Sequence, residues 1–264
     1  MADLRFLLWW VFVIFTIICL IFCIEATIRY RYKRGIDKED EFAQRYKYFG
    51  QPIYDHYQKI QGYELLLREF DSVQKQWRLP RNVNNFPLSK MVLTIRQIDP
   101  QIINSIKILA LNMTVSQITD FRASYFFQWV LGLINNRQLS IEIDARDIQQ
   151  ASFIQRRKLH RLLRKLDHPH IKITIENVDS TKRTFLLLKN LLPYTDYVKF
   201  NIRSFNKSPE QWIDITLAQW QQYLKKHQVT PVVGKVERDE QDALVNQLDI
   251  NLRQGYVYGM PDEF

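Results

Sequence analysis

Cysteine is scarce in this sequence. Among 264 residues there are two cysteines, Cys19 and Cys23, and both lie in one apolar run near the N-terminus. The rest of the chain can therefore form neither a disulfide framework nor a cysteine-based zinc site. Internal repeats and long Pro-, Gly- or Ser-rich linkers are also lacking. Hydrophobic residues at 46% and charged residues at 25% exclude a disordered, collagen-like or coiled-coil chain.

Acidic residues are outnumbered by basic ones. The chain has 37 Lys and Arg against 28 Asp and Glu, which gives a net charge of +9. This balance favours anionic partners such as phosphates, nucleotides or anionic lipid headgroups. Zinc-finger spacing and an RNP-like aromatic motif are missing, so we expect no nucleic-acid partner. His168 and His170 could suggest a metal site, but a Pro-containing turn after a helix is the simpler account.

The N-terminal segment is apolar enough to cross a membrane. Residues 6–24 carry no charge, and as a helix they would span roughly 28 Å, about the thickness of a bilayer core. A cleaved signal peptide is the alternative, but its apolar region is shorter and ends in small residues at a cleavage site. We therefore predict a transmembrane anchor over residues 1–28, with membrane contact through residues 6–24.

Basic residues set the expected orientation of this anchor. Arg5 precedes the apolar run, whereas four basic residues follow it closely, namely Arg29, Arg31, Lys33 and Arg34. The positive-inside rule then predicts a single-pass protein of the cell membrane whose C-terminal domain is cytoplasmic. Residues 29–47 are expected to form a charged juxtamembrane linker.

The remaining residues, 48–264, are expected to fold as one α/β domain. Short runs rich in β-branched or aromatic residues alternate with helical patterns, which is typical of βα units in a parallel sheet or barrel. The expected strands are Val92–Ile95, Ile106–Leu111, Leu139–Ile143, Ile171–Ile175, Tyr197–Ile202 and Thr230–Val233. The expected helices are Val115–Asn135, Asp147–Leu166, Thr181–Leu191, Pro209–His227 and Asp239–Leu248.

One of these expected helices carries an unusual charge pattern. Leu159, Leu162, Leu163 and Leu166 recur at helical spacing and make one apolar stripe. Basic residues surround the stripe, and they are Arg156, Arg157, Lys158, Arg161, Arg164 and Lys165. The simplest interpretation is the outer layer of a barrel with a solvated face. The other is a docking surface for an acidic partner or the membrane surface.

Several short motifs follow one another in a recognisable order. Residues 48–53 read Tyr-Phe-Gly-Gln-Pro-Ile, residues 62–68 read Gly-Tyr-Glu-Leu-Leu-Leu-Arg, and residues 254–256 read Gln-Gly-Tyr before Pro261. Leu111-Asn112, Leu139–Ile143, Val198–Asn201 and Val236-Glu237 lie between them. Together they resemble the EAL domain, the cyclic-di-GMP phosphodiesterase domain of bacteria. The resemblance implies a modified TIM-like (β/α)8 barrel, preceded here by one N-terminal transmembrane helix, with its site at the C-terminal strand ends.

The resemblance also implies a metal site and a ligand site. Active members hold two divalent ions, usually Mg²⁺ or Mn²⁺, with oxygen ligands, and the metals activate the attacking water. The first metal shell would be Glu64, Asn112, Glu142 and Glu176, where Glu176 replaces an aspartate. This shell would be vestigial or hold one ion. Cyclic di-GMP would be bound by Arg68, Gln51, Gln254 and Lys199. Lys199 and Glu237 keep the family residue type.

Four positions depart from the family pattern. The second of the paired aspartates is Asn177, and the aspartate two residues after the lysine is Asn201. The glutamate that resembles a general base falls on Gly234 in the sequence Val233-Gly-Lys-Val-Glu237. Ala145 replaces the second glutamate of a Glu-Ile-Thr-Glu motif. Losing a positioned general base alone costs about 10²–10⁴-fold in rate, so the resemblance implies a catalytically inactive domain.

Binding requires less of the site than hydrolysis does. The first hypothesis is therefore a membrane-tethered receptor for cyclic di-GMP in bacterial second-messenger signalling. The alternative is a scaffold that binds an unknown protein partner and no nucleotide. A weak cyclic-di-GMP phosphodiesterase is a third interpretation.

Overall fold

The computed structural model describes residues 2–31, 44–80, 83–166, 168–205 and 212–263, and it divides the chain into two units, Met1–Phe42 and Ala43–Phe264. The first unit contains helix α1 (Ala2–Arg31), in which Leu4–Thr27 has a mean hydropathy of 3.0 and could span a membrane. By length and composition a signal sequence would pass the same test. Most of the expected linker, residues 32–43, lies outside the described residues, so the boundaries at 28 and 47 stay predictions.

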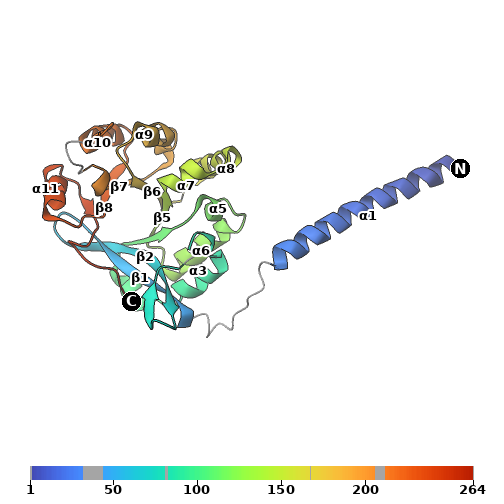
Figure 1. Ribbon diagram of the computed structural model, residues 1–264, viewed down its shortest axis with the longest axis horizontal. Coiled ribbons are helices and arrows are strands. Elements are labelled where there is room, and N and C mark those ends of the chain that lie inside the picture. The colour runs from blue at the N-terminus through green and yellow to red at the C-terminus, as the bar shows by residue number, and fades with distance from the viewer. Residues whose placement is uncertain (1, 32–43, 81–82, 167, 206–211, 264) are drawn as a thin grey trace. The chain divides into compact units, whose positions relative to one another are not determined.

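The second unit is a closed barrel of eight strands. Each strand pairs with the next around the ring, and the first pairs with both the second and the last. In ring order the strands are β1 (Tyr46–Tyr54), β2 (Ile60–Asp71), β4 (Ile108–Asn112), β5 (Gln138–Asp144), β6 (Ile171–Val178), β7 (Tyr197–Asn201), β8 (Thr230–Gly234) and β9 (Leu252–Arg253). Two short strands, β3 (Gln76–Arg78) and β10 (Asp262–Glu263), extend β2 and β1. Figure 1 shows helices surrounding these strands.

Strand β1 is the strand whose direction departs from the all-parallel pattern of a TIM barrel. All pairs from β2 through β4 to β9 are parallel, whereas β1 runs antiparallel to β2 and to β9. The register places Gly50 opposite Leu65, and Tyr54 opposite Arg253. The modified TIM-like fold expected from the sequence is confirmed. Strands β1 and β2 themselves were not among the runs singled out by alternation.

Helices cover the outside of the barrel. Leu159 of α8 and Trp220 of α10 are fully buried, as expected for apolar stripes that pack on strands. Ser152 and Gln155 form a capping box that starts α8. The helices are α3 (Leu88–Ile95), α4 (Pro100–Ser105), α5 (Val115–Ile118), α6 (Ala123–Leu133), α7 (Ala145–Gln150), α8 (Phe153–Lys165), α9 (Lys182–Leu188), α10 (Leu217–Lys226) and α11 (Asp239–Gln247). Single 3-10 turns occur at Val83–Asn85, Leu192–Tyr194 and Ile202–Ser204.

Five of the six expected strands are confirmed, as β4 to β8. The sixth, Val92–Ile95, is wrong because these residues belong to helix α3. Its buried side chains recur at helical spacing, at Leu88, Met91 and Ile95, and this period is not that of a strand. The expected helix Val115–Asn135 is two helices, α5 and α6. The expected helix Asp147–Leu166 is also two, since α7 ends at Gln150 with Ala151 as its C-cap, and Ser152 caps the start of α8.

Candidate functional site

Three glutamates converge at the carboxyl ends of the barrel strands. Glu64 comes from β2, Glu142 from β5 and Glu176 from β6. Each offers one carboxylate oxygen, and these oxygens lie within 4.8 Å of one another. Asn112 at the end of β4 joins the cluster, because its Nδ2 donates a hydrogen bond of 2.6 Å to Glu64 Oε1. The barrel thus brings together all four residues of the expected first metal shell.

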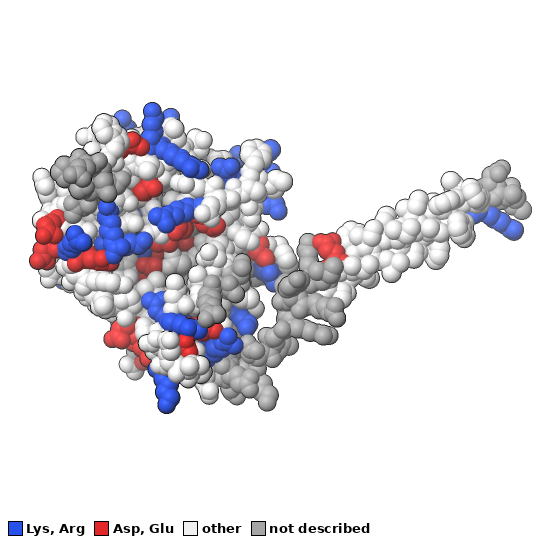
Figure 2. Space-filling model, in the orientation of Figure 1, with Lys and Arg blue, Asp and Glu red and all other residues white. Residues whose placement is uncertain are grey.

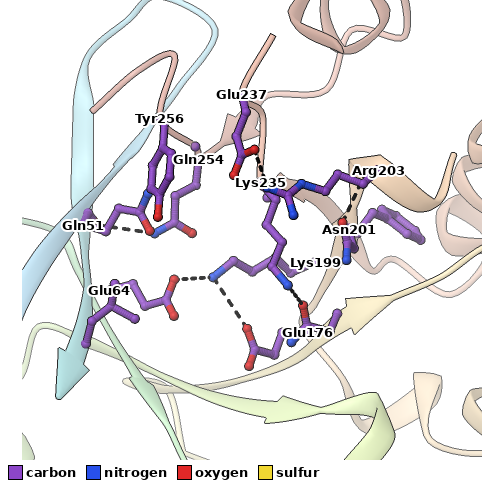
Figure 3. A pocket seen from close by; sticks show the side chains of 15 residues that line it. Gln51, Glu64, Glu176, Lys199, Asn201, Arg203, Lys235, Glu237, Gln254 and Tyr256 are labelled. Atoms are coloured by element: carbon purple, nitrogen blue, oxygen red, sulfur yellow. Dashed lines mark hydrogen bonds and ion pairs between the residues drawn. The ribbon is translucent and has the colours of Figure 1, made fainter. Parts of the chain in front are cut away.

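The Lys199 ammonium lies inside this carboxylate cluster. Its Nζ donates to Glu64 Oε2 at 2.7 Å and to Glu142 Oε2 at 2.9 Å, and it lies 4.0 Å from Glu176 Oε2. Lys199 is itself buried on β7, at 6% exposure. Figure 3 shows the side chains of Glu64, Lys199 and Glu176 pointing toward one another. One cation of the protein therefore neutralises part of a buried negative charge that would otherwise be very costly.

Burial and crowding shift the titration of these groups. Burial, with the nearby Glu64 charge, raises the pKa of Glu142 to about 7, although Lys199 opposes the shift. Burial likewise holds the pKa of Glu176 well above its usual range. For Glu64 burial also acts upward, but the Lys199 charge and hydrogen bonds from Lys199, Asn112 and Gln254 bring its pKa below the usual value. Burial would lower the pKa of Lys199, yet the three carboxylates raise it.

The first shell fits one hard divalent cation. Besides its carboxylate oxygens, it offers Asn112 Oδ1, which is buried and has no hydrogen-bond partner among the described residues. A buried acceptor of this kind is costly unless something occupies it. Mg²⁺ and Mn²⁺ prefer oxygen ligands of exactly these types. Any such ion would compete with the Lys199 ammonium for the same carboxylates.

The residues expected to hold a second cation do not fit one. The two amides, Asn177 and Asn201, already have protein donors on the oxygens that would serve as ligands. Asn177 Oδ1 accepts a hydrogen bond from Lys235 Nζ, and its Nδ2 donates to Asp144 Oδ2 at 2.8 Å. Asn201 Oδ1 accepts from the backbone N–H of Arg203 at 3.2 Å and caps the turn that follows β7. These two amides therefore offer a second ion neither a charged ligand nor a free oxygen.

Two neighbouring cavities open over the glutamate cluster. The first has a volume of about 310 Å³ and the second of about 500 Å³, and both are lined by Glu64, Leu66, Glu176, Asn177 and Lys235. Because they share these residues, the two cavities form one groove across the barrel mouth. Each volume lies in the range of a small-molecule site.

The first cavity contains most of the expected ligand-binding residues. Gln51, Lys199 and Gln254 line it, and the Gln254 amide donates to the backbone oxygen of Gln51 at 3.4 Å. The second cavity has a more apolar lining and contains Arg68. The Arg68 guanidinium lies 5.8 Å from the centre of the Phe49 ring, and half-burial lowers its pKa. Arg68 is therefore separate from the other three, toward the far half of the groove.

The structure also locates the positions at which this chain departs from the family residue or keeps it. Gly234 ends β8 in the first cavity, and a Cβ there would lie 3.3 Å from Lys199 Cε. Glu237 lines the same cavity and forms an ion pair with Arg203 across its rim (Figure 3). Ala145 is the first residue of α7, is buried, and lines neither cavity. Its change therefore does not remove a group from the groove itself.

Residues 39–261 match the sequence profile of the EAL domain. The chain belongs to the EAL domain family. Comparison with curated proteins gives no match.

Solved EAL structures share the fold of this chain at low identity. The Pseudomonas aeruginosa FimX EAL domain, solved bound to c-di-GMP, has 17% identity and a TM-score of 0.63, over 85% of this chain and 96% of that one. The Xanthomonas citri FimX EAL domain, solved in complex with c-diGMP, has 13% identity and a TM-score of 0.66, over 89% and 97%. The Bacillus subtilis YkuI protein, in complex with substrate c-di-GMP and calcium, has 16% identity and a TM-score of 0.65, over 84% and 57%.

Sequence reasoning missed three charged residues of this EAL domain. Lys235, Arg203 and Asp144 were not singled out, although each stands within two residues of a position that was. Lys235 follows Gly234, Arg203 follows Asn201 by two residues, and Asp144 precedes Ala145. The sequence does show these charged residues close to positions that depart from the family pattern. Their arrangement in space, however, depends on contacts between strands that are distant in the sequence.

Proposed function

We propose that this EAL domain is a receptor for cyclic di-GMP that binds the nucleotide without efficient hydrolysis. The observation that carries the proposal concerns the two residues that would hold a second cation. Asn177 and Asn201 replace carboxylates, and their oxygens are already hydrogen-bonded to Lys235 and to the Arg203 backbone. Two-metal hydrolysis needs a second ion to stabilise developing charge, which contributes several kcal/mol.

The groove itself suits a dinucleotide. Its length spans two cavities, as a ligand with two guanines and two phosphates requires. Cationic side chains stand in both halves, with Lys199, Arg203 and Lys235 in the first and Arg68, Arg146 and Lys235 in the second. Arginine and lysine pair with phosphate oxygens through charge-assisted hydrogen bonds. Among the roles proposed for individual residues, Gln51 and Gln254 hold the ligand, and Glu64, Asn112, Glu142 and Glu176 hold at most one Mg²⁺ or Mn²⁺.

Calorimetric titration tests this proposal directly. The full chain in detergent micelles is titrated with cyclic di-GMP in the presence of Ca²⁺, which supports binding without turnover in the family. We expect a dissociation constant in the micromolar range or tighter and a loss of at least about tenfold in Arg68→Ala. Arg157→Ala on the outer helix α8 serves as the control and should bind normally. A folded protein that gives no binding heat would refute the receptor.

Hydrolysis is measured separately on the same preparation. With Mg²⁺ or Mn²⁺, we expect no linear dinucleotide product above the level of a protein-free sample. Turnover comparable to an intact phosphodiesterase would contradict the proposal and favour the enzyme.

A protein-interaction scaffold is the second candidate, and helix α8 is the observation that favours it. Its six basic side chains are all exposed, and so are Phe153 and Ile154 at its first turn. Figure 2 shows Lys and Arg atoms over the part of the domain where Figure 1 places α8. A photo-reactive residue at position 157 should crosslink an acidic membrane partner if this candidate is right. The crosslink should disappear with Arg161→Glu.

The anchor places this domain, on our proposal, at the cytoplasmic face of the cell membrane. The support is the apolar stretch Leu4–Thr27 followed by basic residues. A single new cysteine at the exposed Lys225 on α10 tests the topology in a chain whose Cys19 and Cys23 are replaced. An impermeant maleimide should label it only after spheroplasts are lysed. Labelling of intact spheroplasts would show that the domain has the opposite orientation and would refute this proposal.

A further inference from the structure

Lys235 holds a central place in the groove. It follows the end of β8, its side chain is exposed, and it lines both cavities. Most residues of the groove line only one of them. A cation at this position therefore lies where the two halves of the groove meet.

The backbone of Lys235 has a conformation that lysine rarely adopts. Its φ is 62°, in the left-handed region, where a residue with a Cβ is strained. In the Ala-Glu-Gly-Val-Glu motif of the EAL domain, the residue at this position is the glycine, for which such a backbone costs little. A lysine here is strained relative to that glycine. Lys75 has the same kind of backbone outside the groove, so it is the place of Lys235 in the groove, together with its backbone, that points to a function for its side chain.

Asn177, the hydrogen-bond partner of Lys235, also has a left-handed backbone. Asn177 follows the position of Glu176 on β6 and has a φ of 55°. Its oxygen accepts from Lys235 Nζ, while its Nδ2 is anchored on Asp144. Asp144 is fixed in turn, because its Oδ1 accepts from the Arg146 backbone N–H at 2.7 Å and caps α7. The ammonium is therefore held by a chain of bonds that reaches into the barrel wall.

We infer that the Lys235 ammonium replaces the second divalent cation as the phosphate-binding charge of the groove. This inference rests on the proposed function. The family pattern places a metal-binding carboxylate at position 177, whereas this chain has a neutral amide there and supplies the positive charge from its own side chain. An ammonium attracts a phosphate but does not activate a water molecule, so the exchange preserves binding and removes catalysis. Binding of cyclic di-GMP then does not depend on a second metal ion.

The test uses Lys235→Gly in the full chain. Glycine removes the ammonium and also relieves the left-handed strain, so the variant should fold with an unchanged or slightly higher thermal midpoint. We expect its affinity for cyclic di-GMP to fall roughly 10-fold to 100-fold, the usual effect of losing a charged hydrogen bond. The loss should be the same with Ca²⁺ and with EDTA, and Lys235→Arg should retain most of the affinity.

Lys75→Gly is a matched control. Lys75 is also an exposed lysine with a left-handed backbone, at φ 51°, but it lies in the turn between β2 and β3 and lines neither cavity. Its variant should bind as the unchanged protein does. If the unchanged protein binds and Lys235→Gly binds within about twofold of it, the inference is wrong and the receptor stands. If the unchanged, folded protein does not bind, the proposed function fails, and this inference fails with it.

Discussion

Replacing Lys199 with methionine would leave two buried carboxylates and the half-buried Glu176 without their cation. Glu64 and Glu142 would each lose an ion pair of less than 3 Å, and Asn112 would be the main polar neighbour left to Glu64. Removing one partner of a buried ion pair typically costs about 3–5 kcal/mol, because the remaining charge is left unpaired. For a domain of this size the thermal midpoint should fall by roughly 6–20 °C.

The cost of this change should depend on pH. In the unchanged protein the pKa of Glu142 is about 7, above its ordinary value of 4.5. A carboxyl whose pKa is raised by folding favours the folded state at low pH, and this stability is lost as the pH rises from about 4.5 to about 7. Without Lys199 the pKa of Glu142 rises further, and the pKa of Glu64 loses the lowering effect of the Lys199 charge, so the penalty is largest above neutral pH. Near pH 5 protonation relieves much of it.

Thermal unfolding in EDTA at about pH 8 and about pH 5 measures both effects. Lys172→Met is the matched control, because Lys172 pairs with Asp196 at the same 2.9 Å but its side chain is 33% exposed. An exposed pair of this type contributes about 0–1 kcal/mol, so the control midpoint should shift by no more than a few degrees. Equal shifts in the two variants, or a Lys199→Met shift that does not change with pH, would refute the account of the carboxylate cluster.

Two further predictions concern glycines of the groove. Gly234→Glu restores a carboxylate at the position that resembles the general base, yet we expect no hydrolysis with Mg²⁺ or Mn²⁺, because Asn177 and Asn201 still leave the second cation without charged ligands; clear turnover by this variant would overturn the assignment. Gly255→Ala should lower the thermal midpoint and weaken nucleotide binding, since Gly255 has a φ of 154° and its new Cβ would lie 2.1 Å from the Val236 carbonyl oxygen, beside Gln254 and Tyr256. Gly132→Ala in α6, where a Cβ meets nothing within 4 Å, should instead raise the midpoint slightly; equal effects in the two alanine variants would contradict the role given to the Gly255 backbone.

The barrel could be predicted from the sequence because its parallel strands are short apolar runs between helical patterns. Strand β1 could not be found in this way, since two of its buried positions are Gly50 and Pro52, residue types that are uncommon inside strands. Helix α3 was misread for a related reason. Its last four residues are apolar or β-branched, and a run that short does not distinguish a buried strand from a helix turn.

The candidate site was predictable where its residues stand at known motif positions. Glu64, Asn112, Glu142 and Glu176 do lie together, as the resemblance implied. The pairing of Lys235 with Asn177 was not predictable, because the two residues are 58 positions apart and meet only when β6 and β8 close around the barrel. Their left-handed backbones also leave no clear signal in a single sequence, since neither residue is a glycine.

The pattern of losses in this groove argues for a retained ligand more than for an abandoned site. A buried polar atom that loses its partner is costly. Here the substituted amides are satisfied, since the oxygens of Asn177 and Asn201 each accept a hydrogen bond from a nearby protein donor. By contrast, Asn112 Oδ1 at the expected first cation site has no partner among the described residues. At the expected second cation site the two amide oxygens are thus held by the Lys235 ammonium and by a backbone N–H, while the expected first site still offers an acceptor to an ion, and both features agree with the proposed receptor.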